Sequence, residues 1–248
     1  MLYGNESISQ YSKTNFTIWM VMAFQAGVIN IGGFMACHRF VSHVTGFSTF
    51  FGMEVVERRY AHAMGMLLVP LFFLGGTMLS GQLVDIRLKL RLKPKYYISF
   101  GVIFFFIFSV WIAGVSGFWG QFDQALSHTK GYLLLATLCL VCGIQNGTIT
   151  AASRAAAVRT THLTGVTTDL GLGIVRLLNR RALKGQVRKD EARRSLLLLG
   201  IILSFGSGSV VGGYVFSLYG YWGFAVPALT SGVLFAAMIA FHQRSAKA

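Results

Sequence analysis

The hydrophobic positions of this chain are grouped in long blocks and do not alternate with polar positions at amphipathic spacing. Six blocks are evident, and each has about 20 residues, enough for a helix to cross a hydrocarbon core of about 30 Å. They cover approximately residues 16–36, 62–84, 96–117, 131–152, 195–217 and 221–241. Because backbone polar groups in lipid must be paired within the segment, each block is predicted to be a transmembrane helix.

Two further segments are partly apolar but are too polar and too short for ordinary spans. They are HRFVSHVTGFSTFFG, residues 38–52, and RTTHLTGVTTDLGLGIV, residues 159–175. Each contains an H-x-T-G motif, and the glycine of that motif permits a break or a close approach of the backbone. We therefore predict an all-α polytopic membrane protein with six transmembrane helices and two short re-entrant or broken helices.

Charged residues are few and lie mainly between the apolar blocks. They make up 12% of the 248 residues, and Lys and Arg outnumber Asp and Glu by 22 to 8. In a soluble protein the net charge of +14 would indicate nucleic acid, but basic clusters between apolar blocks are typical of cytoplasmic loops beside anionic lipid. The expected partner is therefore a lipid bilayer and not nucleic acid. Placing the clusters at 87–95 and 176–194 inside makes both termini cytoplasmic, with Arg58 and Arg59 as the exception.

An internal repeat is the most informative feature of the sequence. AGVIN, ending at Asn30, matches CGIQN, ending at Asn146. VSHVTGFSTFFG matches TTHLTGVTTDLG, and FLGGTMLSG, ending at Gly81, matches FGSGSVVGG, ending at Gly213. The three matches occur in the same order, with separations from 116 (30 to 146) to 132 (81 to 213), so chance is a poor explanation.

The repeat predicts two halves of opposite orientation. Each half contains one span, an H-x-T-G segment and two more spans, and an odd number of spans inverts the second half. The predicted divisions are a polar tail at 1–15, a first repeat at 16–117, an outer loop at 118–130, an inverted repeat at 131–241 and a tail at 242–248. Inverted repeats are typical of secondary transporters and some channels, whose sites lie near the midplane where irregular helices meet.

Polar residues within the repeats are the candidate substrate-binding residues. Asn30 and Asn146 either line a cavity at equivalent positions or hold helices together. The two H-x-T-G segments would aim free backbone N–H groups at a central site, with the histidines binding substrate or carrying a proton; alternatively, the histidines cap the turns. The candidates in and beside these segments are His43, Thr45, Gly46, Arg159, His162, Thr164, Gly165 and Thr168.

Asp169 is the acidic residue of the second polar segment, and Phe50 occupies the equivalent position in the first. Burying an unpaired ion destabilises the folded protein by roughly several kcal/mol. One interpretation is a structural ion pair with Arg154 or Arg159, and the other is a carboxylate that couples transport to a proton or cation. Gln82 and Asp85 end the second block, where they are expected to form an interfacial cap.

The segments AGVINIGGFMACHRFVSHVTGFSTFFG and GIQNGTITAASRAAAVRTTHLTGVTTDLG resemble the YoaK family, also called the DUF1275 family, over nearly the whole chain. The resemblance implies a multi-pass protein of the bacterial inner membrane and supplies no substrate. The family pattern has Asn after the Thr-Gly pair of the first segment, where this chain has Phe47.

The function predicted from these features is secondary transport of a small polar or anionic solute. A channel of the same architecture is one alternative, and an intramembrane enzyme or a scaffold for a partner is another. The sequence has no nucleophile–base–acid arrangement, metal cluster or nucleotide motif, so we expect neither enzymatic activity nor a cofactor. Cys139 and Cys142 form a C-x-x-C within an apolar run, which favours membrane-buried residues over a redox or zinc site. The oligomeric state is open, and a homo-oligomer is compatible with the sequence.

Overall fold

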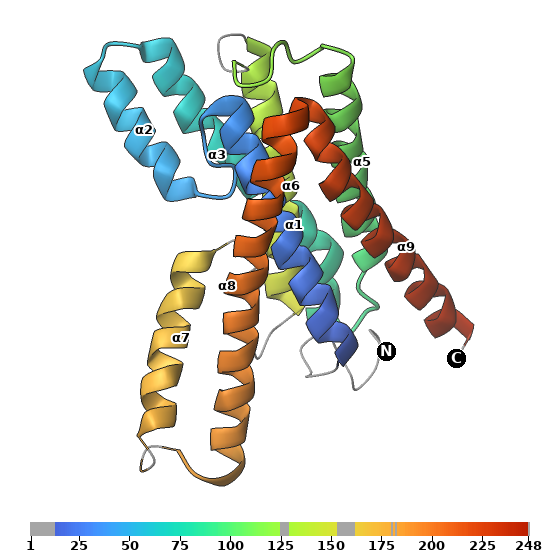
Figure 1. Ribbon diagram of the computed structural model, residues 1–248. Coiled ribbons are helices and arrows are strands. Elements are labelled where there is room, and N and C mark those ends of the chain that lie inside the picture. Colours follow the sequence, from blue (N-terminus) through green and yellow to red (C-terminus); the bar gives the residue numbers. More distant parts are fainter. Residues whose placement is uncertain (1–12, 125–128, 153–161, 180, 182, 248) are drawn as a thin grey trace.

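Every regular element of the described chain is helical (Figure 1). The computed structural model describes residues 13–124, 129–152, 162–179, 181 and 183–247. The long helices are α1 (Lys13–Cys37), α3 (Tyr60–Ser80), α5 (Tyr96–Val115), α6 (Thr129–Ala152), α8 (Gly185–Tyr219) and α9 (Ala225–Lys247). The shorter helices are α2 (Val44–Val56), α4 (Ile86–Lys89) and α7 (Leu163–Leu178). A π-helical turn at Gly81–Asp85 joins α3 to α4, and a 3-10 turn at Gly220–Phe224 joins α8 to α9.

The described residues contain five continuous helical stretches that are long and apolar enough to cross a membrane. They are Thr14–Cys37, Tyr60–Lys89, Tyr96–Val115, Thr129–Ala152 and Gly185–Gln243. The last stretch contains both α8 and α9, which turn back on one another at Gly220 (Figure 1). Gly220 has a φ of +53°, in the left-handed region that favours glycine. The prediction of an all-α, multi-pass membrane protein is therefore confirmed.

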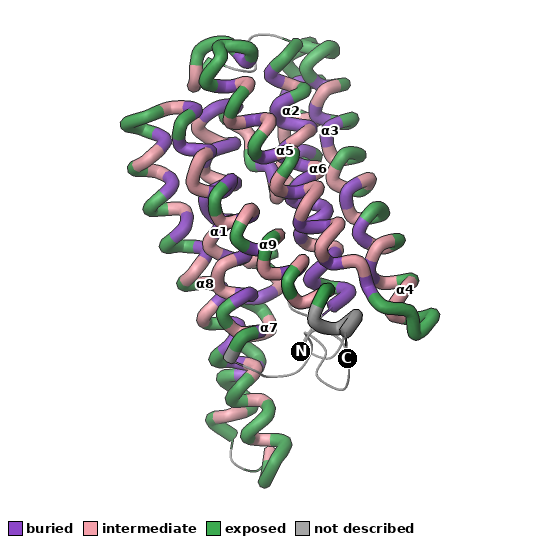
Figure 2. The backbone as a smooth tube through the Cα atoms, turned by 90° about the vertical axis from the view of Figure 1, so that its right-hand side faces the viewer, coloured by how far each residue is buried: buried purple, intermediate pink, exposed green. Residues whose placement is uncertain are grey.

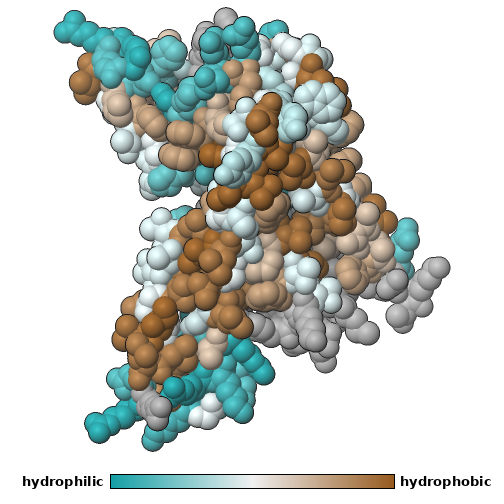
Figure 3. Space-filling model, in the orientation of Figure 1, coloured by the Kyte–Doolittle hydropathy of each residue, from teal (hydrophilic) through white to brown (hydrophobic). Residues whose placement is uncertain are grey.

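Much of the exposed surface is apolar, in contrast to the surface of a soluble protein. Large apolar side chains such as Leu68, Phe105 and Leu203 are exposed at 46%, 63% and 64%. Figure 3 shows this apolar surface between hydrophilic ends of the molecule, and Figure 2 shows exposed positions along the outside of the long helices. Exposed apolar area of this extent requires a nonpolar surrounding, which a lipid bilayer provides.

The closest helix packing joins distant parts of the chain. α1 packs along α8, and α6 packs along α3. A Cβ atom at Gly27 of α1 would collide with the carbonyl oxygen of Phe205, and one at Gly143 of α6 would collide with that of Phe73. Small residues therefore allow backbone-to-backbone contact in both pairs, which is how membrane helices gain packing energy without a hydrophobic driving force.

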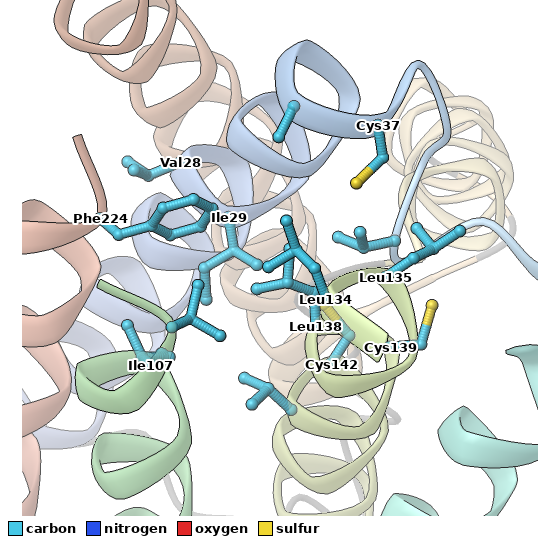
Figure 4. Close-up of a cluster of buried hydrophobic side chains, with 14 of the residues drawn as sticks. Val28, Ile29, Cys37, Ile107, Leu134, Leu135, Leu138, Cys139, Cys142 and Phe224 are labelled. Carbon is cyan, nitrogen blue, oxygen red and sulfur yellow. The ribbon is translucent and has the colours of Figure 1, made fainter. Parts of the chain in front are cut away.

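A buried cluster of apolar side chains lies where α1, α5, α6 and the 220–224 turn meet (Figure 4). Ile29, Ile107, Leu138 and Phe224 are fully buried there. The three cysteines are buried and unbridged, as expected for small apolar residues of the core.

The two H-x-T-G segments form α2 and α7, which begin close together and run in opposite directions (Figure 1). α2 packs on α3 and extends to one end of the bundle, whereas α7 packs on α8 and extends to the other end. The second end also carries α4 and both ends of the described chain (Figure 2), together with the basic clusters at 87–95 and 176–194. We call it the basic end of the molecule.

Candidate functional site

A cavity of about 490 Å³ lies beside the start of α2 and extends along the groove between α3 and α6. Figure 3 shows the surface hollowed between the part of the molecule that contains α2 and the part that contains α7. The described residues that line the cavity are Ser42, His43, Val44, Thr45, Phe73, Thr77, Gly81, Asp85, Asn146, Gly147, Thr150, Ala151 and His162. The first cavity therefore combines several hydroxyl groups, an amide, two imidazoles and a carboxylate.

A second cavity of about 210 Å³ lies beside the start of α7, near α1 and α8. Its described lining residues are Asn30, Phe40, Ser42, His43, His162, Leu163, Thr164 and Phe205. The two cavities share Ser42, His43 and His162. Residues as distant in the sequence as Asn30 and Phe205 thus meet around two histidines.

The histidines occupy the N-cap positions of α2 and α7, but neither imidazole caps its helix by a hydrogen bond. His43 Nε2 lies 2.8 Å from the hydroxyl oxygen of Thr45. The backbone turns are closed instead by main-chain bonds, in which the N–H of Gly46 donates to His43 O and that of Val166 donates to His162 O. The first N–H groups of both helices are therefore not capped by these side chains, and a helix N-terminus favours a negative or electron-rich group.

Each predicted asparagine lines one cavity. Asn30 lines the smaller cavity, where its Oδ1 accepts a hydrogen bond of 2.9 Å from Ser42 Oγ. Asn146 lines the larger cavity. A hydroxyl group also bridges each closely packed helix pair: Thr77 Oγ1 donates to Gly143 O at 3.3 Å, and Ser209 Oγ donates to Gly27 O at 3.4 Å.

Several predicted substrate-binding residues are not among the residues that line either cavity. Gly46, Gly165 and Thr168 lie in α2 and α7, and the hydroxyl of Thr168 donates to Thr164 O at 2.9 Å. Arg159 lies outside the described residues. Of the predicted set, the structure therefore brings together Asn30, His43, Thr45, Asn146, His162 and Thr164.

Asp169 faces α8, where its carboxylate pairs with Arg194 at 2.9 Å. A structural ion pair was one of the two interpretations of Asp169, but the expected partners, Arg154 and Arg159, lie outside the described residues. Arg176 and Glu191 form a second ion pair between α7 and α8 at 3.3 Å. Both contacts hold α7 against α8, and Asp169 lines neither cavity.

Two features of the structure were not predicted. Asp85, expected to be an interfacial cap, lines the larger cavity. Gln25 and Gln145 form a buried amide pair, in which Gln25 Nε2 donates to Gln145 Oε1 at 3.1 Å and Gln145 Nε2 donates to Met22 O at 2.8 Å. The spacing of four from Thr77 through Gly81 to Asp85 was a partial signal, because each step drifts by about 40° in a regular α-helix; the partner of each glutamine depends on packing alone.

The fold and the two cavities define a polytopic helical membrane protein with an apolar core and two cavities that contain polar groups. The chain belongs to the family described as "Protein of unknown function (DUF1275)", which matches residues 18–237, nearly the whole sequence. The resemblance inferred from the two H-x-T-G segments is thereby confirmed. No curated protein and no solved structure matches the chain.

Proposed function

We propose that this protein is a secondary transporter of a small polar or anionic solute, which binds where α2 and α7 begin. The observation that carries the proposal is the meeting of two oppositely directed helix N-termini at cavities that share His43 and His162. Discontinuous helices whose N-termini face a midplane site are the means by which many transporters bind substrate.

An inverted repeat is part of the proposal, and equivalent contacts support it. Adding 116 to residue numbers in α1 gives positions in α6, and adding 132 to those in α3 gives positions in α8. Gly27 against Phe205 thus corresponds to Gly143 against Phe73. Gly208 against Phe24 corresponds in the same way to Gly76 against Leu140. The hydroxyl bridges of Ser209 and Thr77 also correspond.

Unequal cavities support alternating access. The larger cavity contains Phe73 and Asn146, the smaller contains their equivalents Phe205 and Asn30, and both contain His43 and His162. Exchanging the conformations of the two halves would enlarge the smaller cavity and close the larger one. Because α1 packs on α8 and α3 packs on α6, the moving units are α1–α7–α8 and α2–α3–α6, and each unit contains helices of both repeats.

The orientation in the membrane follows from charge. The basic clusters and both ends of the described chain lie at one end of the molecule (Figure 2). The positive-inside rule places this end in the cytoplasm, with six crossings of the bacterial inner membrane. In this orientation the larger cavity extends toward the cytoplasm, so the conformation is inward-facing.

The test begins with solute binding. Purified protein is screened by thermal shift against small inorganic and organic anions, sugars and amino acids, and stabilising solutes are measured for uptake into proteoliposomes. His43→Gln and His162→Gln should each weaken solute binding at least about tenfold, equivalent to about 1.4 kcal/mol of binding free energy, and should lower stabilisation and uptake at a given solute concentration. His62→Gln is the matched control, because His62 bonds to Tyr132 and lines neither cavity. Unchanged uptake in both cavity variants would contradict the proposal.

A channel is the second candidate, because Ser42, His43 and His162 line both cavities. In a channel, movement of these shared side chains would connect the cavities without motion of the helix units. The two functions differ in kinetics: a transporter gives saturable uptake that a counter-solute accelerates from the opposite side. A channel gives flux that rises nearly linearly with the gradient and shows no such acceleration.

A further inference from the structure

A π-helical turn brings the Asp85 carboxylate to the larger cavity. Phe73, Thr77, Gly81 and Asp85 all line this cavity from the α3 side. An α-helix advances about 100° per residue, so positions four apart drift by about 40°, and Asp85 would lie about 120° away from Phe73 in a regular helix. Instead the N–H of Ile86 donates to Gly81 O, an i→i+5 bond. The wider turn rotates Asp85 back toward the cavity, and such turns are frequent at functional sites.

Asp85 lies in the part of the larger cavity that is nearest the basic end of the molecule. Twelve residues separate Phe73 from Asp85, which corresponds to about 18 Å along an α-helix. The cavity therefore reaches from the histidines at the starts of α2 and α7 to a carboxylate near the predicted cytoplasmic surface. A group at this position can exchange ions with that compartment while it remains in contact with the cavity.

Among the described residues, Asp85 has one ion-pair partner. Lys89, one turn further along, pairs with it at 2.8 Å, and the Lys89 side chain is 65% exposed. The neighbouring Arg87 donates to Lys93 O. The π-helical turn also packs against α6 and α5. At this end α6 offers Thr150 and Ala151, and α5 begins with Tyr96 and Tyr97; the remaining titratable groups of the cavity are His43 and His162.

Asp85 differs in these respects from Asp169. Asp169 pairs with Arg194 across to α8 and lines neither cavity, so its charge is committed to holding two helices together. Asp85 pairs only with an exposed lysine on its own helical stretch, and that ammonium group can be hydrated when the carboxylate is neutralised. The repeat places Ser217 at the position equivalent to Asp85. An acid is therefore present on one side of the site and absent on the other.

We propose that Asp85 is the carboxylate by which the larger cavity takes up a proton or a small monovalent cation from the basic end of the molecule. This inference rests on the proposed function, because it treats the cavity as the transport site. In the proton case the carboxylate binds H⁺ to form the neutral acid, and Lys89 retains its charge in water. In the cation case the ion replaces the Lys89 ammonium as the partner of the carboxylate.

The test is chemical labelling of the full-length protein in proteoliposomes. Dicyclohexylcarbodiimide reacts with protonated carboxyl groups in apolar surroundings, and peptide mass spectrometry identifies the modified residue. Asp85 should be modified, modification should decline as the pH is raised, and Asp85→Asn should lose this adduct. Lys89→Met should react more strongly at the same pH, because the carboxylate has lost its ammonium partner. Asp169→Asn is the matched variant and should leave labelling of Asp85 unchanged.

Labelling is carried out in sodium chloride and in choline chloride, to distinguish a proton site from a sodium site. Protection of Asp85 by sodium but not by choline identifies a sodium site, whereas equal labelling in both salts identifies a proton site. The proposal is overturned if Asp85 is unreactive at every pH, or if it reacts no differently from the water-facing Asp190. Labelling needs no knowledge of the solute, so its result is separable from the effect of the histidine variants on uptake.

Discussion

Gly27 of α1 lies directly against the carbonyl oxygen of Phe205 in α8, so that no side chain fits between the two helices. The equivalent contact joins Gly143 of α6 to Phe73 of α3. These contacts lie between helices that are far apart in the sequence, and they define the two closely packed helix pairs. The cavities lie beside these pairs, which makes the glycine contacts a structural requirement of the proposed site.

Substitution of these glycines should therefore destabilise the protein. Gly27→Ala and Gly143→Ala each force two backbones apart, and overpacking of this kind costs about 1–3 kcal/mol. Thermal unfolding in detergent measures the effect. Gly75→Ala is the control, because a Cβ atom at Gly75 meets no other atom within 4 Å. If all three variants unfold at the same temperature, the close contacts are wrong.

The buried glutamine pair gives a second prediction. Gln25 and Gln145 are each 1% exposed, and Thr230 donates to Gln25 Oε1 at 2.7 Å, which links α9 to the α1–α6 contact. Gln145→Leu leaves Gln25 and Met22 O without this partner and should cost about 1–3 kcal/mol. The double variant Gln25→Leu/Gln145→Leu should lose less than the sum of the single losses, since neither amide is then left without the other. Additive losses in a thermal unfolding cycle would argue against the hydrogen bond.

Glu54 anchors α2 on the side opposite the basic end. Its side chain is 5% exposed and its carboxylate contacts Arg39 at 3.0 Å and Arg59 at 2.7 Å. Glu54→Ala removes the partner of the largely buried Arg39 and should destabilise the protein by about 3 kcal/mol. Hydrogen exchange should also increase in residues 44–56, because α2 loses its ion pairs with Arg39 before it and Arg59 after it. Glu57→Ala, at a side chain that is 47% exposed, should have little effect on either measurement.

The proposed orientation predicts the accessibility of single cysteines. The three native cysteines are buried, so their replacement by alanine or serine provides a background for labelling. Cysteine at the exposed position of Ala61 should react with an impermeant maleimide in intact cells, whereas cysteine at the exposed position of Gln186 should react only after the cells are opened. The reverse pattern would place the basic end outside and would contradict the inward-facing assignment.

The sequence by itself determined the class of protein and the local elements. Apolar blocks of about 20 residues specify membrane helices because the bilayer imposes its thickness on every segment separately. The H-x-T-G motifs likewise marked the starts of α2 and α7, since a break in a helix depends on a few neighbouring residues. Family membership also followed from these motifs. The number of crossings, the inverted repeat and transport remain predictions that the labelling and uptake experiments test.

The tertiary structure alone decided which polar groups meet. Asp169 and Arg194 are 25 positions apart, and Gln25 and Gln145 are 120 apart, so no local pattern pairs them. Asp85 reaches the cavity because one π-helical turn, which packs against α5 and α6, changes its direction. In a membrane the energy of such contacts comes from close packing and hydrogen bonding between helices, and neither can be inferred from the hydrophobicity along the chain.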